Sequence, residues 1–344
     1  MQSVADILNT LLRWAPSELA WEKDNIGLLV GSPRARVTRV LVCLDITEHV
    51  IAEAVDRGAD LIVAHHPVIF RPLYALRTDN PQGRMLGALL RNGIAVIAMH
   101  TNADAAPNGL NHALAARLDL VNQRPLEPAR DQMRRVEFRL TAEQADADML
   151  GRLLKDEDIE SWYTQHTLEG TLLLVVDGQK NAVSRVRDLV NEAFGAAVLS
   201  QRSFVQERTH PAAGIGIVGD LPAAMEADTF LEFVKQRLGC ERLRVTPAIQ
   251  GAQIQRVAVC GGAGSSYVRA AIASGAQCFV TGDLTHHTFL DYGGDILLVD
   301  AGHFETEQVF VELCAKVLES ASFQDSEKIS ILQVRTNTNP VRFV

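Results

Sequence analysis

The stretch TRVLVCLDITEHVIAEAVDRGADLIVAHH, residues 38–66, decides the fold. It predicts an apolar strand at 38–46, an amphipathic helix at 49–59 and a second apolar strand at 60–66. The same alternation of strand and helix continues to residue 120. Short apolar strands that alternate with helices indicate a mostly parallel sheet with helices on its faces.

A second region repeats this pattern 217 residues further along the chain. Without a gap, the shift places Val42 on Val259 and Val63 on Val280, and it keeps strand, helix and strand in phase. The match indicates two related α/β halves, with a chance alignment of unrelated strand–helix units as the alternative. Open α/β sheets bind ligands at the carboxyl ends of their strands, so these ends are where a site is expected.

Residues between the two halves have a different order of predicted strands and helices. Their β-α-β-β-α-β order predicts a small inserted ferredoxin-like α+β domain. We therefore expect a core first half at 1–127, the insert at 128–208 and a core second half at 209–344.

Composition excludes several classes of protein. A chain of 344 residues that is 47% hydrophobic and 22% charged is an ordinary globular protein and not a disordered one. The net charge of −9 argues against broad nucleic-acid binding, which needs a basic surface. The N-terminus lacks the basic leader of a signal peptide, and no apolar run approaches the ~20 residues that span a bilayer. The five cysteines are scattered and form no C-x-x-C pair, so a cytoplasmic location is expected.

Histidines and carboxylates follow several of the predicted strands. His65 and His66 end one strand, and Pro67 holds His66 in an extended conformation, so both imidazoles can reach one centre. Asp104 follows the next strand, where it is either a hard metal ligand or a helix cap. His303 and Glu307 are four residues apart and share a helix face, although a glutamate in a first turn is also favoured by the helix dipole.

Two further motifs lie at strand ends. TGDLTHH, residues 281–287, offers Asp283, His286 and His287 as proton carriers, or it is a turn with an aspartate cap. GGAGSS, residues 261–266, is a glycine-rich turn from strand to helix. Its N–H groups could hold an anion, or it is a tight turn with a serine cap.

The joint placement of these residues indicates a two-metal site. Three imidazoles and two carboxylates exceed the three protein ligands of an ordinary catalytic zinc site. They suit two divalent ions about 3.5–4 Å apart with a bridging carboxylate and a bridging water. Zn, Fe, Mn, Co and Ni all fit such mixed ligands. The predicted ligands are His65, His66, Asp104, His303 and Glu307.

The motifs, taken in order, resemble the Nif-three-like dinuclear metal centre family, whose members are called GTP cyclohydrolase I type 2 homologs. The matching stretches are WEKDNIGLLVG (21–31), AHHPVIF (64–70), HTNADAAPNGLN (100–111), GGAGSS (261–266), TGDLTHH (281–287) and GHFETE (302–307). The chain departs from the family pattern at Ala103 and Asn108, neither of which is a predicted ligand.

The resemblance implies that the five residues above bind two divalent metals, with Glu307 as the bridging carboxylate. It also implies a toroidal homohexamer whose metal sites face an internal cavity, and an insert similar to PII or CutA proteins. The family label implies ring-opening hydrolysis of GTP.

These observations predict a metal-dependent hydrolase of a nucleotide or another phosphorylated metabolite, with a metal-bridging hydroxide as nucleophile. Gly262 and Gly264 would hold an anionic group of the substrate. The expected proton carriers are His100, Asp283, His286 and His287. The alternatives are a metal-binding or regulatory protein without turnover and a scaffold that acts through the hexamer. A hydrolase needs an open coordination position, whereas a storage or sensor site is saturated by protein ligands.

Overall fold

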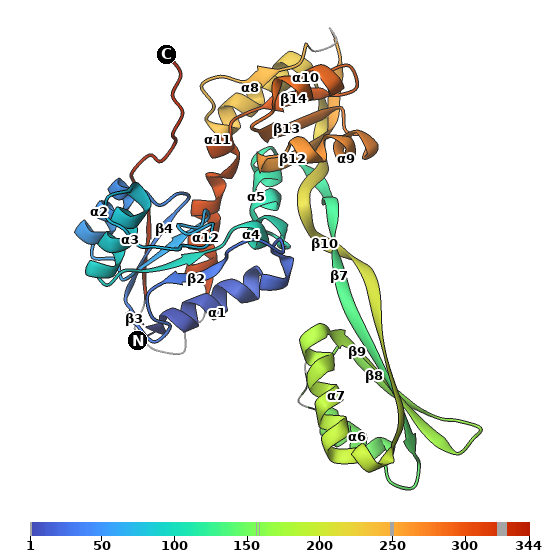
Figure 1. Cartoon of the computed structure of the whole chain (residues 1–344). Helices are drawn as coiled ribbons and strands as arrows, with labels where there is room; N and C mark the ends of the chain where they lie inside the picture. Colours follow the sequence, from blue (N-terminus) through green and yellow to red (C-terminus); the bar gives the residue numbers. More distant parts are fainter. Residues whose placement is uncertain (1, 156, 158, 248–250, 322–328) are drawn as a thin grey trace. The chain divides into compact units, whose positions relative to one another are not determined.

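The computed structural model describes residues 2–155, 157, 159–247, 251–321 and 329–344. Its contacts divide the chain into two compact units (Figure 1). The first unit is Met1–Ala129 with Pro211–Val344, and the second is Arg130–His210. None of the helices in the described ranges combines the length and the hydrophobicity that a bilayer crossing requires.

The first sheet of the first unit has the strand order β15-β4-β5-β6-β2. The strands are β2 Gly27–Val30, β4 Arg39–Cys43, β5 Leu61–Ala64, β6 Ala95–Ala98 and β15 Ser330–Gln333. Neighbours from β15 to β6 are parallel, and β2 is antiparallel to β6. A separate short pair joins β1 Gln2–Ser3 to β3 Arg36–Val37.

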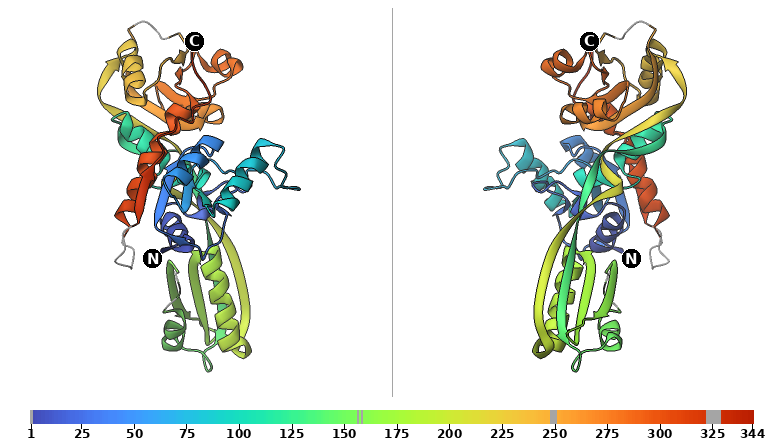
Figure 2. Two further views of the ribbon diagram at one scale, coloured as in Figure 1. Left: turned by 90° about the vertical axis from the view of Figure 1, so that its left-hand side faces the viewer. Right: turned by 90° about the vertical axis from the view of Figure 1, so that its right-hand side faces the viewer.

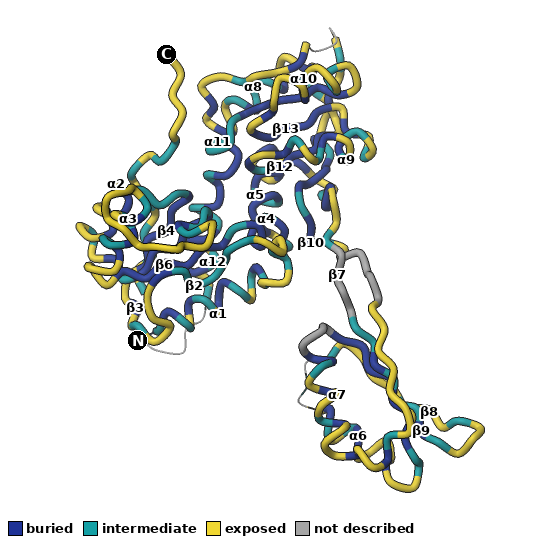
Figure 3. The backbone as a smooth tube through the Cα atoms, viewed as in Figure 1, coloured by how far each residue is buried: buried dark blue, intermediate teal, exposed yellow. Residues whose placement is uncertain are grey.

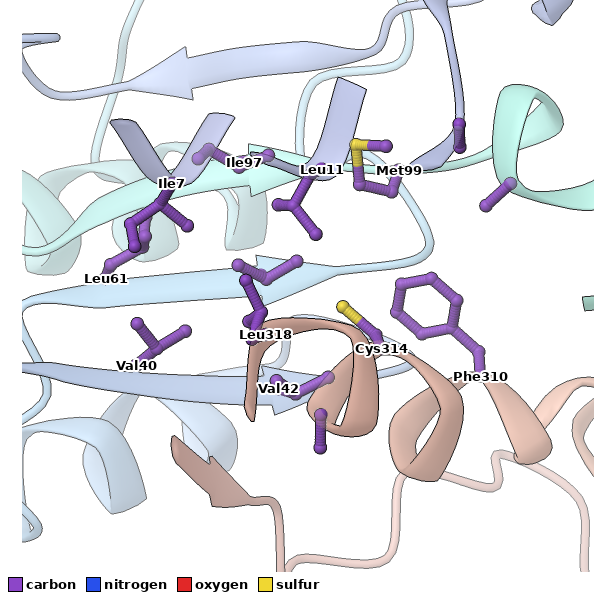
Figure 4. Close-up of a cluster of buried hydrophobic side chains, with 14 of the residues drawn as sticks. Ile7, Leu11, Val40, Val42, Leu61, Ile97, Met99, Phe310, Cys314 and Leu318 are labelled. Carbon is purple, nitrogen blue, oxygen red and sulfur yellow. The ribbon is translucent and has the colours of Figure 1, made fainter. Parts of the chain in front are cut away.

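Helices cover both faces of this sheet. Val40 and Val42 pack against α1 (Val4–Trp14) and α12 (Val309–Ser320), as the close-up in Figure 4 shows. Leu41 and Cys43, which alternate with them, pack against α2 (Glu48–Asp56) and α3 (Pro81–Arg91). Because both faces are buried, β4 is a continuous apolar run, as expected for a parallel strand between two helical layers.

A second sheet of the same unit has the same three-layer construction. The strands are β11 Arg244–Val245, β12 Gln253–Ala263, β13 Cys278–Gly282 and β14 Leu297–Asp300, with the end of β10 (Val198–Glu226) beside β12. α5 (Leu110–Arg117) and α8 (Ala227–Leu238) cover one face. α9 (Val268–Ala273) and α10 (His286–Tyr292) cover the other.

Strand register repeats with the offset that the sequence predicts. Val42 pairs with Val63 in the first sheet, and Val259 pairs with Val280 in the second. The α/β fold is confirmed, but the sheets are mixed rather than uniformly parallel. The central strands are parallel, while β2, β10 and β11 add antiparallel neighbours.

The second unit follows the predicted order of elements. Its segments are β7 (Val121–Thr141), α6 (Ala147–Leu154), β8 (Ser161–His166), β9 (Thr171–Gln179), α7 (Lys180–Phe194) and β10. The strand order is β10-β7-β9-β8, and α6 and α7 share one apolar core with the strands (Figure 2). A ferredoxin-like domain at 128–208 stays a prediction.

β7 and β10 are longer than the sequence predicts. The expected start of the insert at 128 lies inside β7, and its expected end at 208 lies inside β10. Pro128 and Pro211 stand where the two strands pass from one unit to the other, but a proline does not by itself distinguish a continuous strand from a turn. Figure 3 shows buried residues gathering along the strands and the inward faces of the helices.

Candidate metal centre

Five side chains meet at the carboxyl ends of strands from both sheets of the first unit. His65 and His66 follow β5, and their N–H groups still donate to the carbonyls of Cys43, the last residue of β4, and of Leu44 after it. Asp104 lies in α4 (Thr101–Ala105), just after β6. The remaining two side chains come from α11 (His303–Glu307), the short helix after β14.

Glu307 lies at the middle of this cluster. Its Oε2 atom is 3.0 Å from Nε2 of His303 and 3.1 Å from Nε2 of His66. Its Oε1 atom is 3.8 Å from Nε2 of His65, which in turn lies 3.6 Å from Oδ1 of Asp104. The two oxygens of one carboxylate therefore face two different sets of ligands.

Each of the three histidines uses its Nδ1 atom away from the cluster. The Nδ1 atom of His65 lies 2.9 Å from the carbonyl oxygen of Met99. In His66 the Nδ1 atom lies 2.7 Å from Asp45 Oδ1, and in His303 it lies 2.7 Å from Asp283 Oδ2. All three partners only accept, so each Nδ1 carries a proton and each ring turns its Nε2 atom toward the cluster. Metal-binding histidines are held in this way.

His100 lies beside the cluster and is oriented by Asp24. Its Nδ1 atom is 2.8 Å from Asp24 Oδ1, and its ring centroid is 5.2 Å from that of His65. Burial opposes ionisation of Asp24, but hydrogen bonds from His100 and Thr101 hold the pKa of Asp24 well below its usual range. His65, His66 and His100 form one group whose ligand atoms could share a metal ion, and His66, His303 and Glu307 form another.

Several polar atoms of the cluster are buried without a hydrogen bond. They include His65 Nε2 and Asp104 Oδ1, which lie 3.6 Å apart. A buried polar atom without a partner costs free energy. A cation between them would satisfy all of these atoms, so the donor set fits metal ions.

The charges within the cluster lead to the same conclusion. Burial raises the pKa of Asp104. Burial also opposes ionisation of Glu307, yet the surrounding histidines hold its pKa well below the usual range. Burial lowers the pKa of His66, but Asp45 and Glu307 raise it to about 10, while Glu307 chiefly raises that of His303 to about 9. The negative charge of the buried Glu307 carboxylate is therefore balanced by positive charge in the cluster, which either protons on the histidines or metal ions can supply.

The glycine-rich turn, where an anion site at Gly262 and Gly264 is predicted, packs against the cluster. The Gly262 N–H already donates to Thr306 Oγ1, at 3.0 Å, so it is not free to bind a ligand. A Cβ atom on Gly262 would lie 2.2 Å from Glu307 Oε1, and one on Gly264 would lie 2.1 Å from Thr281 Oγ1. These glycines make room for neighbouring side chains, and Gly262 lets Glu307 reach the cluster.

Of the other expected proton carriers, one contacts a histidine of the cluster and two begin a helix. Asp283 contacts the cluster through His303. His286 and His287 begin α10 and are exposed, with ring centroids 5.7 Å apart. Asp24 and Asp45 are the partners that the sequence analysis missed. The sequence feature that could have revealed them is their position beside strands of the first sheet. Asp24 lies in WEKDN before β2, and Asp45 lies in LDIT after β4.

Comparisons with known proteins agree over the whole chain. The family model described as Duf34/NIF3 (NGG1p interacting factor 3) matches residues 2–340. Two relatives are each named GTP cyclohydrolase 1 type 2 homolog, and the alignments cover 98% of both partners. The one from Bacillus subtilis (strain 168) is 31% identical over 366 residues, and the one from Halalkalibacterium halodurans is 29% identical.

Solved structures match as completely. A Bacillus cereus protein related to NIF3 superposes with a TM-score of 0.81 at 29% identity, covering 100% of this chain and 99% of that one. A Staphylococcus aureus protein gives a TM-score of 0.88 at 25% identity, with the same coverage. The chain therefore belongs to the Duf34/NIF3 family.

Proposed function

We propose that this chain binds two divalent metal ions and is a metal-dependent hydrolase of a nucleotide or another phosphorylated metabolite. The observation that carries the proposal is that the two carboxylate oxygens of Glu307 face different ligands. Its Oε1 faces His65, and its Oε2 faces His66 and His303. A carboxylate that spans two ligand sets is typical of a bridging ligand in a dinuclear site.

The ligands divide into two sets around this carboxylate. His65 and Asp104 would hold one ion with Glu307 Oε1. His66 and His303 would hold the other with Glu307 Oε2. When bound, two divalent ions supply Lewis acidity and activate a water nucleophile. Imidazole and carboxylate donors suit Zn, Fe, Mn, Co or Ni, and the two carboxylates offset part of the metal charge.

The surrounding residues would orient the ligands and move protons. Asp45 and Asp283 hold the Nδ1 protons of His66 and His303, so they keep both rings turned toward the cluster. His100 would carry protons at Nε2 because Asp24 engages its Nδ1. His286 and His287 would exchange protons with the substrate from the exposed start of α10.

The names of the relatives give the first substrate class to test. Two relatives that match the full chain carry the name GTP cyclohydrolase 1 type 2 homolog, so purine nucleoside triphosphates come first. Resemblance to the family also supports a toroidal homohexamer, and the buried free cysteines are in keeping with the cytoplasm.

A metal-binding regulatory protein without turnover is the second proposal, and the second unit favours it. We propose that residues 128–208 are a ferredoxin-like domain similar to PII or CutA proteins. The strand order β10-β7-β9-β8 and the shared core of α6 and α7 support this assignment. A compact second unit with its own core could bind an effector independently of the metal centre.

One experiment separates the two functions. Protein reconstituted with each divalent metal is incubated with a panel of nucleoside triphosphates and other phosphorylated metabolites, and products are quantified by liquid chromatography. The hydrolase proposal expects turnover that disappears in Glu307→Gln and persists in Glu312→Gln, a change in the following helix at a half-buried glutamate that pairs with Arg117 and Lys316. Metal-loaded wild type that leaves the whole panel of phosphorylated compounds intact would favour the regulatory protein instead.

A further inference from the structure

The last residues of the chain follow β15 and run along the metal centre. The segment, residues 334–344, begins firmly attached to the first sheet. The Val334 N–H donates to the Val42 carbonyl at 3.0 Å, and the N–H groups of Arg335 and Thr336 donate to Glu53 at 2.9 Å. The backbone from Val334 to Thr336 is therefore held by hydrogen bonds that its N–H groups donate.

Thr338 connects this segment to a metal-ligand candidate in two steps. Its Oγ1 donates to Asp45 Oδ2 at 3.1 Å, and the other oxygen of Asp45 lies 2.7 Å from His66 Nδ1. The Asp45 side chain is 32% exposed, so water can compete for its oxygens. The Thr338 hydroxyl occupies Oδ2 and leaves Oδ1 in place for His66.

Asn339 makes a parallel contact to the second half of the core. Its Nδ2 donates to Glu305 Oε1 at 2.8 Å, and Glu305 lies between the two candidate ligands of α11. The end of the segment stays with this half, because the Arg242 guanidinium lies 5.6 Å from the Phe343 ring centroid. The segment thus reaches from β4 to α11.

We propose that Thr338 is a positioning residue of the metal centre, which acts on His66 through Asp45. The proposal rests on the proposed metal-binding function. A carboxylate fixed at both oxygens holds the imidazole in one tautomer and one rotation, so His66 Nε2 needs no reorganisation when it binds metal. Asn339 helps by tying the same segment to α11. The segment therefore acts on the site although none of its side chains is a ligand.

Cobalt(II) titration followed by visible absorption tests this role. The ligand-field bands report the geometry at the ion, and the titration gives its affinity. Thr338→Val removes the hydroxyl at nearly constant shape, and Thr338→Ser restores it. We expect Thr338→Val to bind cobalt about fivefold more weakly in the site of His66, with shifted bands, and Thr338→Ser to match wild type within about twofold.

Thr336→Val is the matched control in the same segment. It removes a hydroxyl that donates to Glu53, while the N–H groups of Arg335 and Thr336 still donate to the same carboxylate and keep the segment attached. Its cobalt affinity and bands should stay those of wild type. Circular dichroism melting of every variant checks that the fold is retained.

Each outcome decides the proposal. Unchanged affinity and bands in Thr338→Val would overturn it, as would equal weakening in Thr338→Ser, which would assign the effect to lost packing. Equal weakening in Thr336→Val would also overturn it, because loose attachment would then explain the result. Wild type that binds no cobalt would overturn the metal-binding function as well, whereas tight binding with an unaltered Thr338→Val overturns the role of Thr338 alone.

Discussion

His66 and His303 are 237 residues apart in the sequence, yet their Nε2 atoms lie 3.4 Å apart. The first follows β5 in one sheet and the second follows β14 in the other. Two imidazole nitrogens on one metal ion, each about 2.0–2.1 Å from it, are separated by about this distance. The centre therefore requires both halves of the core, and neither half carries it alone.

Asp283 should control metal affinity through His303. Its backbone φ of 55° is one that asparagine tolerates, so Asp283→Asn keeps the loop while it removes the charge that holds His303 Nδ1–H. We expect metal affinity to fall by about 10–100-fold, as for other partners of ligating histidines. Isothermal titration calorimetry measures the change, with the exposed Asp291→Asn as control. Equal affinities of Asp283→Asn and wild type would contradict the assignment.

Gly262→Ala should empty the site. The residue has a φ of 63°, and its new Cβ would lie 2.2 Å from Glu307 Oε1, so the carboxylate must move. Gly239→Ala is the matched control, because its φ is 68° and its Cβ would meet no heavy atom of the described residues within 4 Å. Both changes should cost about 1–2 kcal/mol of backbone strain, but only Gly262→Ala should lose metal. Full metal occupancy in Gly262→Ala would refute the steric argument.

Glu53 should make stability depend on pH in the acid range. Burial opposes its ionisation, yet hydrogen bonds from Thr336, Arg335 and Arg57 lower its pKa from 4.5 to about 2. A depressed folded pKa gives stability that is present above about pH 4.5 and is lost as the pH falls toward 2. Glu53→Gln should therefore be less stable than wild type at pH 6, by a margin that shrinks toward pH 2. Urea unfolding across this range measures it, and a margin independent of pH would argue against the depressed pKa.

The five cysteines should be unreactive in the folded protein. All are free and buried, and burial raises the pKa of Cys43 and Cys260 well above the usual range and that of Cys240 to about 12. The thiolate is the reactive form, so Ellman's reagent should label less than about one thiol per native chain and all five after denaturation. Rapid labelling of the native protein would show that the core opens readily.

Much of the core could be predicted because buried parallel strands are continuous apolar runs. The strands at 38–46 and 60–66 contain β4 and β5, and the histidines that follow β5 lie at a strand end for that reason. An identical offset in strand pairing also follows directly from the repeated sequence.

Other features left no clear trace in the sequence. Asp45 follows a strand, a position that helix caps and turn residues also occupy, and only the fold shows that its carboxylate contacts His66. The hydroxyl of Thr338 reaches the same carboxylate from 293 residues away. Gly262 has the pattern of an anion-binding turn, but the packing of Thr306 and Glu307 against it gives it another use.

The number of metal ions per chain tests the central claim most directly. Wild type, Glu307→Gln and the control Glu312→Gln, whose carboxylate pairs with Arg117 and Lys316, are purified without added metal, reconstituted, desalted and analysed by elemental mass spectrometry. A bridging role for Glu307 predicts about two ions per chain in wild type and in Glu312→Gln, and a clear loss in Glu307→Gln. No more than one ion in wild type, or two ions retained by Glu307→Gln, would contradict the dinuclear centre.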